Sequence, residues 1–140
     1  MKFALSSLLM ATMMLASPLL NAQDEEIIEE ESTERVCISI RGIRSFEAFS
    51  NDHMYVKEGS SKHYLFTMRT SCHNLRNSTG IAIKDGTSRV CSDGFGEVVY
   101  RDRMSSQRLQ SCRIDNIEQV ESKDEAKAIA EARKEAKDDK

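Results

Sequence analysis

The sequence predicts an all-β fold: a small antiparallel sheet, curled or closed into a barrel, framed by two disulfides and followed by a charged C-terminal helix. Short segments within residues 36–120 alternate apolar and polar side chains, which is the period of half-buried strands. The same region holds all four cysteines of the chain. It shows no helical apolar spacing, whereas residues 121–140 are rich in alanine and long charged side chains, which favour helix.

The first 22 residues have the layout of a secretory signal peptide. Lys2 gives a positive start, residues 3–15 are nearly all apolar or small, and Pro18 interrupts the run before Ala22. The apolar stretch is shorter than the ~20 residues that a membrane span needs. We therefore expect cleavage after Ala22, a mature chain with no membrane span, and a periplasmic or secreted location.

Charge divides the rest of the chain into parts. Residues 23–35 hold seven acidic side chains and one arginine, and such a block of like charge repels itself. The predicted organisation is a signal peptide at 1–22, an acidic disordered lead-in at 23–35, a disulfide-framed β domain at 36–120 and a charged helical tail at 121–140.

The strands are expected in the following order. Residues 36–44 (VCISIRGIR) alternate until Gly42, which interrupts the pattern as a β-bulge would. Residues 53–57 (HMYVK) and 63–68 (HYLFTM) follow on either side of a turn at 58–61, and the second places Tyr64, Phe66 and Met68 on one face. Further strands are expected within 80–86, 97–101 and 112–120. Closing such a sheet into a barrel would remove its exposed edges.

The tail begins with a helix signal. Ser122 and Glu125 have the spacing of a capping box. Ile129 is the only large apolar residue that follows, so the tail has no wide apolar stripe to bury. We expect a solvated, partly frayed helix; the alternative is a helix that docks on a partner or on the envelope surface.

The cysteines are expected to form two disulfides, because an even number of thiols in a small exported chain indicates a disulfide framework. Four cysteines allow three connectivities. We favour Cys37–Cys112, since the first and last strands of a closed barrel lie side by side, and Cys72–Cys91, which would pin the segment between them. No two cysteines have the close spacing of zinc ligands.

The histidines suggest no chemistry. His73 follows Cys72 directly, but neighbours in a strand point to opposite faces, so adjacency does not make Cys72 a primed nucleophile. His53, His63 and His73 are ten residues apart, a spacing with no structural period, and we expect surface positions for them. We predict no catalytic residue, no metal and no cofactor. A metal-binding protein or enzyme that uses these histidines remains the alternative.

Arginines are the candidate binding residues. Arg101 and Arg103 flank Asp102 and so share a face of one strand; Arg41 on an early strand and Arg113 on the last could extend a basic stripe. Arginine grips carboxylates and other anions bidentately. The alternative is a solvated face. Nucleic acid is not expected, because only 6% of the residues are aromatic. The candidate set is Arg41, Arg69, Arg76, Arg101, Arg103 and Arg113.

Several segments carry a family resemblance. CISIRGIRS at 37–45, YL at 64–65, CHNL at 72–75, RVCSD at 89–93 and Cys112 resemble small exported bacterial proteins of the domain of unknown function 6491 family. The resemblance covers about residues 36–120. It implies a disulfide-framed β domain and supplies no activity, substrate or catalytic residue.

This chain departs from the family pattern at one turn. It has His73-Asn74 where the family usually has Pro-Gly, and asparagine tolerates the left-handed conformation that glycine would take. Together these observations predict an exported, non-catalytic β module that binds an anionic envelope component or a protein partner. The alternative within binding is an inhibitor of a foreign hydrolase.

Overall fold

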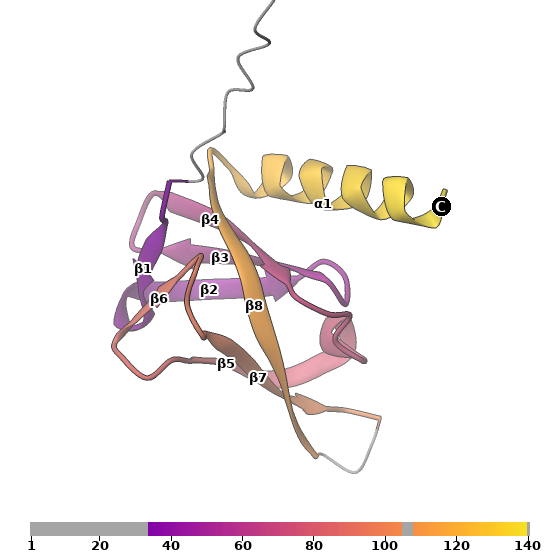
Figure 1. Ribbon diagram of the computed structural model, residues 1–140, viewed down its shortest axis with the longest axis horizontal. Helices are drawn as coiled ribbons and strands as arrows, with labels where there is room; N and C mark the ends of the chain where they lie inside the picture. The colour runs from indigo at the N-terminus through magenta and orange to yellow at the C-terminus, as the bar shows by residue number, and fades with distance from the viewer. Residues whose placement is uncertain (1–33, 105–107, 140) are drawn as a thin grey trace, which may run out of the picture. The chain divides into compact units, whose positions relative to one another are not determined.

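The computed structural model describes residues 34–104 and 108–139, so the predicted signal peptide and nearly all of the acidic lead-in lie outside the described residues. Strands dominate, as predicted, and one long helix follows them (Figure 1). The elements are β1 (Cys37–Ser39), the 3₁₀ turn η1 (Ile40–Gly42), β2 (Ile43–Ala48), β3 (His53–Glu58), β4 (Lys62–Met68), the 3₁₀ turn η2 (Leu75–Asn77), β5 (Ser78–Lys84), β6 (Arg89–Cys91), β7 (Glu97–Asp102), β8 (Leu109–Val120) and α1 (Lys123–Asp138).

Six strands form one antiparallel sheet in the order β2-β3-β4-β8-β7-β5. The long strand β8 joins its two halves, because the C-terminal part of β8 pairs with β4 and its N-terminal part pairs with β7. The sheet curls without closing, which confirms the predicted curled antiparallel sheet (Figure 1). β1 and β6 form a separate two-stranded sheet.

The predicted bulge at Gly42 is wrong, because the chain turns a corner there. The turn η1 separates β1 from β2, and this also moves Arg41 off the strand where we expected it. A side chain at Gly42 would bring its Cβ to 3.0 Å from Glu58 Cγ, so a larger residue there would require the Glu58 side chain to shift. Glu58 holds the corner: its carboxylate accepts hydrogen bonds from Ser39 N (2.8 Å) and the Tyr64 hydroxyl (3.2 Å).

The strand β6 was not predicted. It has three residues, too few to display a period of two. Its conformation comes instead from pairing with β1, which places Ile38 opposite Val90, both fully buried. The two-stranded sheet therefore contributes side chains to the same core as the large sheet.

The main core lies on the concave side of the curled sheet. Tyr64, Phe66 and Met68 of β4 face it together, which confirms the predicted face of that strand. Alternation along β3 and β4 sends Tyr55 and Leu65 to the opposite side, where both are buried as well. The buried residues of the main core are Ile38, Met54, Val56, Tyr64, Phe66, Met68, Cys72, Leu75, Val90, Val98, Tyr100, Ile114 and Ile117.

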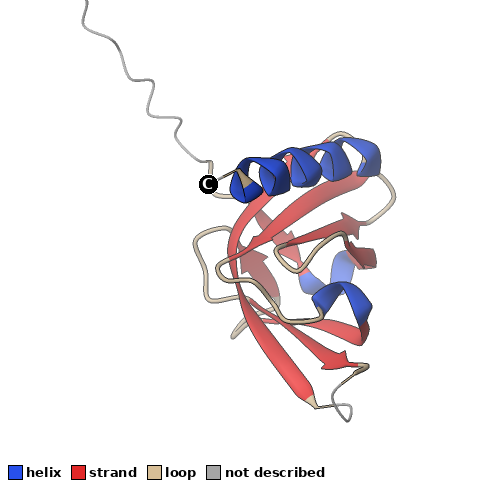
Figure 2. Cartoon of the chain, turned by 90° about the vertical axis from the view of Figure 1, so that its right-hand side faces the viewer, coloured by secondary structure: helices blue, strands red, loops and turns tan. Residues whose placement is uncertain are grey.

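The helix α1 covers that opposite side of the sheet, where it contacts β3, β4 and β8 (Figure 2). The predicted start of the helix is confirmed, since Ser122 caps it and Ser122 Oγ accepts a hydrogen bond from Glu125 N. The expectation of a merely solvated helix is wrong. Ala126 and Ala130 are buried with Leu65 and other residues of the sheet, because small side chains let a helix approach a sheet closely without a wide apolar stripe.

Both disulfides are present, but the favoured pairing is wrong. Cys37 bonds to Cys91 and Cys72 bonds to Cys112. The sheet is not a closed barrel, so β1 pairs with β6 and not with β8, and this places Cys37 directly opposite Cys91. Cys72 follows β4, the neighbour of β8, and so lies within reach of Cys112, with 6.0 Å between the Cα atoms.

The disulfide pairing can be tested by a tryptic map under non-reducing conditions. Cleavage after arginine places each cysteine in its own peptide: 36–41, 70–76, 90–101 and 109–113. We expect 36–41 to be linked to 90–101 and 70–76 to 109–113 by mass spectrometry. A linked pair of 36–41 with 109–113 would contradict the structure, and reduction before digestion serves as the control.

Candidate binding cleft beside the C-terminal helix

The six candidate arginines lie on different elements. Arg41 is on η1, and Arg101 and Arg103 are exposed at and just after the end of β7. Arg69, after β4, pairs with Asp115 at 3.3 Å. Arg113, on β8, places its guanidinium over the Phe95 ring, 5.7 Å from the centroid. Arg76, on η2, lines a cleft, and the other five do not line that cleft.

Arg76 is held by a well-anchored loop between β4 and β5. Cys72 ties the loop to β8 through the disulfide, and the neighbouring Leu75 is fully buried. The Tyr100 hydroxyl donates a 2.7 Å hydrogen bond to the carbonyl of His73. The Cys72 sulfur lies 3.4 Å from the Thr70 carbonyl, a contact without a hydrogen bond, since a disulfide sulfur carries no proton.

The turn of this loop confirms the interpretation of the His73-Asn74 exchange. Asn74 adopts a left-handed conformation, with φ 58° and ψ 17°. It is the one residue other than glycine with positive φ in the described ranges. Its side-chain amide also donates to both carboxylate oxygens of the buried Asp102, at 3.3 and 3.2 Å. Asparagine therefore adds a contact that glycine could not provide.

The cleft lies between this loop, the β2–β3 turn and α1. Its first part has a volume of about 290 Å³, close to the lower end of ligand-sized pockets. Phe49 lines it on the sheet side and Ala130 on the helix side. An adjoining hollow shares Ser50, Arg76 and Lys134 with it. The residues of the first part are Glu47, Ala48, Phe49, Ser50, Arg76, Lys127, Ala130, Glu131 and Lys134.

Most charges around the cleft are already paired. Three ion pairs link Lys123 to Glu47, Lys127 to Glu131 and Lys137 to Asp52. Among the charged residues that line the first part, Arg76 and Lys134 have no ion pair within the part of the chain that the structure describes. These two cations come from opposite walls of the cleft, the loop and the helix.

Sequence reasoning missed the contribution of the helix to this cleft. Lys127 and Lys134, seven residues apart on α1, both line its wall. Ala126 and Ala130 are four residues apart, so they lie on one face of the helix, and this face is buried. That spacing is the signal from which the lysines next to the buried face could have been found. The prediction of a solvated helix depends on large apolar residues, of which the tail has only Ile129.

Charge-assisted contacts fix the helix on the sheet. Arg133 donates to both carboxylate oxygens of Glu118, at 2.6 and 2.8 Å, and to Thr67 Oγ1 at 3.4 Å. The hydrogen bonds from Arg133 lower the pKa of Glu118, and those to Glu118 raise the pKa of Arg133. The bidentate geometry fixes the position of the helix as well as stabilising it.

The histidines do not all lie at the surface. His53, on β3, is only 6% exposed beneath α1, so the surface position predicted for it is wrong. His63, on β4, is half-buried, and its Nδ1 shares a 2.6 Å hydrogen bond with the Tyr55 hydroxyl. His73 is exposed in the loop after β4. Within residues 34–104 and 108–139 no cluster of three or more potential metal ligands occurs.

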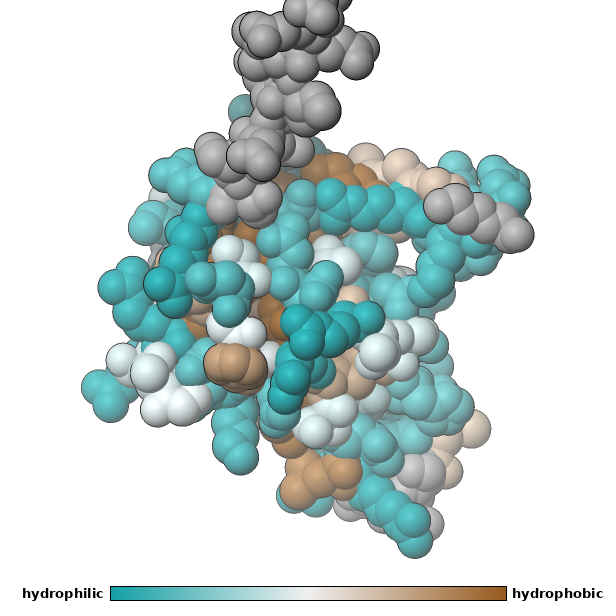
Figure 3. All heavy atoms as spheres, viewed as in Figure 1, coloured by the Kyte–Doolittle hydropathy of each residue, from teal (hydrophilic) through white to brown (hydrophobic). Residues whose placement is uncertain are grey.

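The remaining surface is mostly hydrophilic, with small separate apolar patches on the face seen in Figure 3. Phe95 and Met104 are the most exposed large apolar side chains that the structure describes, at 79% and 77%. None of the helices in the described part has both the length and the apolar character to cross a membrane.

The fold and cleft define the class: a disulfide-framed, curled antiparallel β protein with a docked C-terminal helix. The model of a family of unknown function, DUF6491, matches residues 1–137, and the chain belongs to this family. The match extends beyond residues 36–120, the region of the resemblance, and includes the residues of α1 up to 137. No curated protein and no solved structure matches the chain.

We expect Asn74→Ala to be less stable than Asn74→Gly. Both variants lose the hydrogen bonds to Asp102, but a left-handed backbone costs alanine about 1 kcal/mol more than glycine. The free energy of unfolding in urea, measured with both disulfides intact, should therefore differ by about that amount. Equal stability of the two variants would show that the turn does not need the left-handed conformation.

Proposed function

We propose that this chain is an exported, non-catalytic binding module and that the cleft beside α1 is its ligand site. Two disulfides fit an oxidising compartment outside the cytoplasm, where such bonds persist. Export through a signal peptide at 1–22 is part of this proposal. The partner class is an acidic one: an anionic envelope component, or a protein that presents carboxylates.

One observation carries the proposal: Arg76 and Lys134 line the same cleft from opposite walls, and neither has an ion pair in the described structure. A carboxylate placed between them would be contacted by both walls. Arg76 offers a planar guanidinium that binds carboxylates bidentately, and Lys134 adds a mobile point charge.

The wall around these cations suits an extended acidic chain. Arg76 and Lys134 line both the first part of the cleft and the adjoining hollow of about 480 Å³, so the two cations lie where these spaces meet. Ion pairs of Glu47, Glu131 and Asp52 limit the repulsion of an acidic ligand by these groups, whereas Asp138, which lines the hollow, has no ion pair among the described residues. Phe49 offers an apolar surface beside them.

The proposal can be tested with a tetraglutamate peptide as the probe. Titration followed by NMR should give saturable shifts at residues around Arg76 and Lys134. In the double variant Arg76→Glu/Lys134→Glu, we expect at least a ~10-fold loss of affinity, because each charge-assisted hydrogen bond contributes about 1.5–3 kcal/mol. Binding should also weaken as salt rises, since these groups are exposed.

The matched control is Arg101→Glu/Arg103→Glu, which makes the same change in net charge outside the cleft. It should bind the peptide almost as the parent protein does. If both double variants lose affinity equally, binding depends on overall charge and the cleft is not the site. Peptide-induced chemical-shift changes that are confined to β7 would also contradict the proposal.

A further inference from the structure

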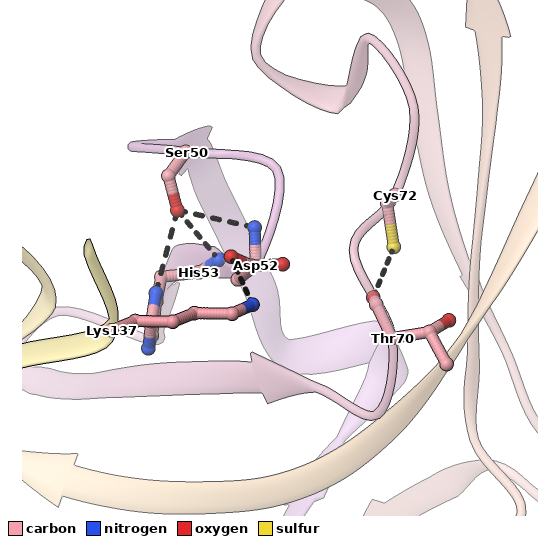
Figure 4. Close-up of polar contacts among 6 residues, drawn as sticks. All are labelled: Ser50, Asp52, His53, Thr70, Cys72 and Lys137. Atoms are coloured by element: carbon pink, nitrogen blue, oxygen red, sulfur yellow. Dashed lines mark hydrogen bonds and ion pairs between the residues drawn. The ribbon is translucent and has the colours of Figure 1, made fainter. Parts of the chain in front are cut away.

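The buried His53 lies where the helix meets the sheet. It begins β3, and alternation places its side chain on the same side as Tyr55, toward α1. Its Nδ1 is 3.4 Å from Ser50 Oγ, which in turn accepts from the backbone N–H groups of Asp52 and His53, at 3.1 Å each (Figure 4). Ser50 itself lines the cleft.

Charged groups surround this histidine from several elements. Two cations of α1 act on it, Arg133 and Lys137, and two anions, Glu118 of β8 and Asp52 of the β2–β3 turn. Arg133 donates to Thr67, the residue opposite His53 in the β3–β4 register, and Lys137 reaches Asp52 at 3.4 Å (Figure 4). Each anion is thus already paired with one of the two cations.

We propose that His53 is a pH-sensitive switch for the docking of α1. While its ring is neutral, the helix stays on the sheet. Protonation places a third positive charge beside Arg133 and Lys137 at a position where the His53 side chain is buried, and this weakens the hold of the sheet on the helix. Histidine suits this role because its charge changes near neutral pH.

The helix can respond to protonation of His53, because it buries few residues against the sheet. Its buried residues are Ala126 and Ala130, with Ile129 partly buried, and its remaining ties to the sheet are ion pairs of exposed groups. The single contacts from Lys123 and Lys137 each contribute little, so the bidentate pair of Arg133 with Glu118 is the main charged tie. Since Lys127, Ala130 and Lys134 form one wall of the cleft, release of the helix would remove that wall. The inference that His53 regulates ligand binding therefore rests on the proposed function, whereas the pH dependence of helix docking does not.

The direction of the pH dependence follows from the pKa of His53. Burial is the main cause that lowers this pKa below its ordinary value of 6.5, and the charge of Arg133 lowers it further. The undocked state therefore binds more protons than the docked state. Docking is at full strength above pH 6.5 and weakens as pH falls from there through the lowered pKa. The Glu118 carboxylate, with its pKa below 4.5, acts at lower pH.

The test is NMR of the purified chain with both disulfides intact and no ligand. The methyl resonances of Ala126 and Ala130 report docking, and the ring resonances of His53 report its protonation. As pH falls from about 7.5 to about 5, the undocked population of the parent protein should rise by up to about tenfold per pH unit, the limit set by one proton. His53 should titrate below 6.5.

Two variants make the result specific. His53→Gln should lose the pH response of the Ala126 and Ala130 methyl groups over this range, while His73→Gln, at an exposed histidine, should keep it. An unchanged response in His53→Gln would overturn the proposal. So would a His53 that titrates at or above 6.5, or methyl groups that stay docked while His53 titrates; these readings need only the parent protein. Because no ligand is present, the outcome is independent of whether the cleft binds carboxylates.

Discussion

The double pairing of β8 is the interaction on which the rest of the structure depends. One run of twelve residues pairs with β4 along one part and with β7 along the other, so it joins two groups of strands into a single curled sheet. Its inward side chains Ile114 and Ile117 complete the core. Cys112 anchors the loop that carries Arg76, and Glu118 holds the helix through Arg133.

The proposed site and the proposed switch both follow from that strand. The disulfide from Cys112 to Cys72 fixes one wall of the cleft, and the ion pair from Glu118 to Arg133 fixes the other. The two walls are held by different contacts. The loop is held by a covalent bond and the buried Leu75, whereas the helix is held mainly by small side chains and exposed charges. The proposed change in the charge of His53 would act on the wall that no covalent bond holds.

Errors in the sequence predictions have a common physical cause. The disulfide pairing was inferred from a closed barrel, and the 3₁₀ turn at Gly42 sends β1 away to pair with β6 instead. Which strands lie together depends on contacts far apart in the chain, and periodicity does not report these. The buried His53 was missed for the same reason, since β3 is covered on both faces only after α1 folds back over it.

The sequence by itself determined the local features. Alternation located β3, β4, β5, β7 and β8, Ser122 marked the start of the helix, and the exchange at Asn74 indicated a left-handed turn, because each depends only on neighbouring residues. Only the tertiary structure decided which cysteines pair, which side of the sheet the helix covers and which two cations share a cleft. Those outcomes depend on how separate strands and the helix pack, and the chain brings these elements together only when the whole sheet forms.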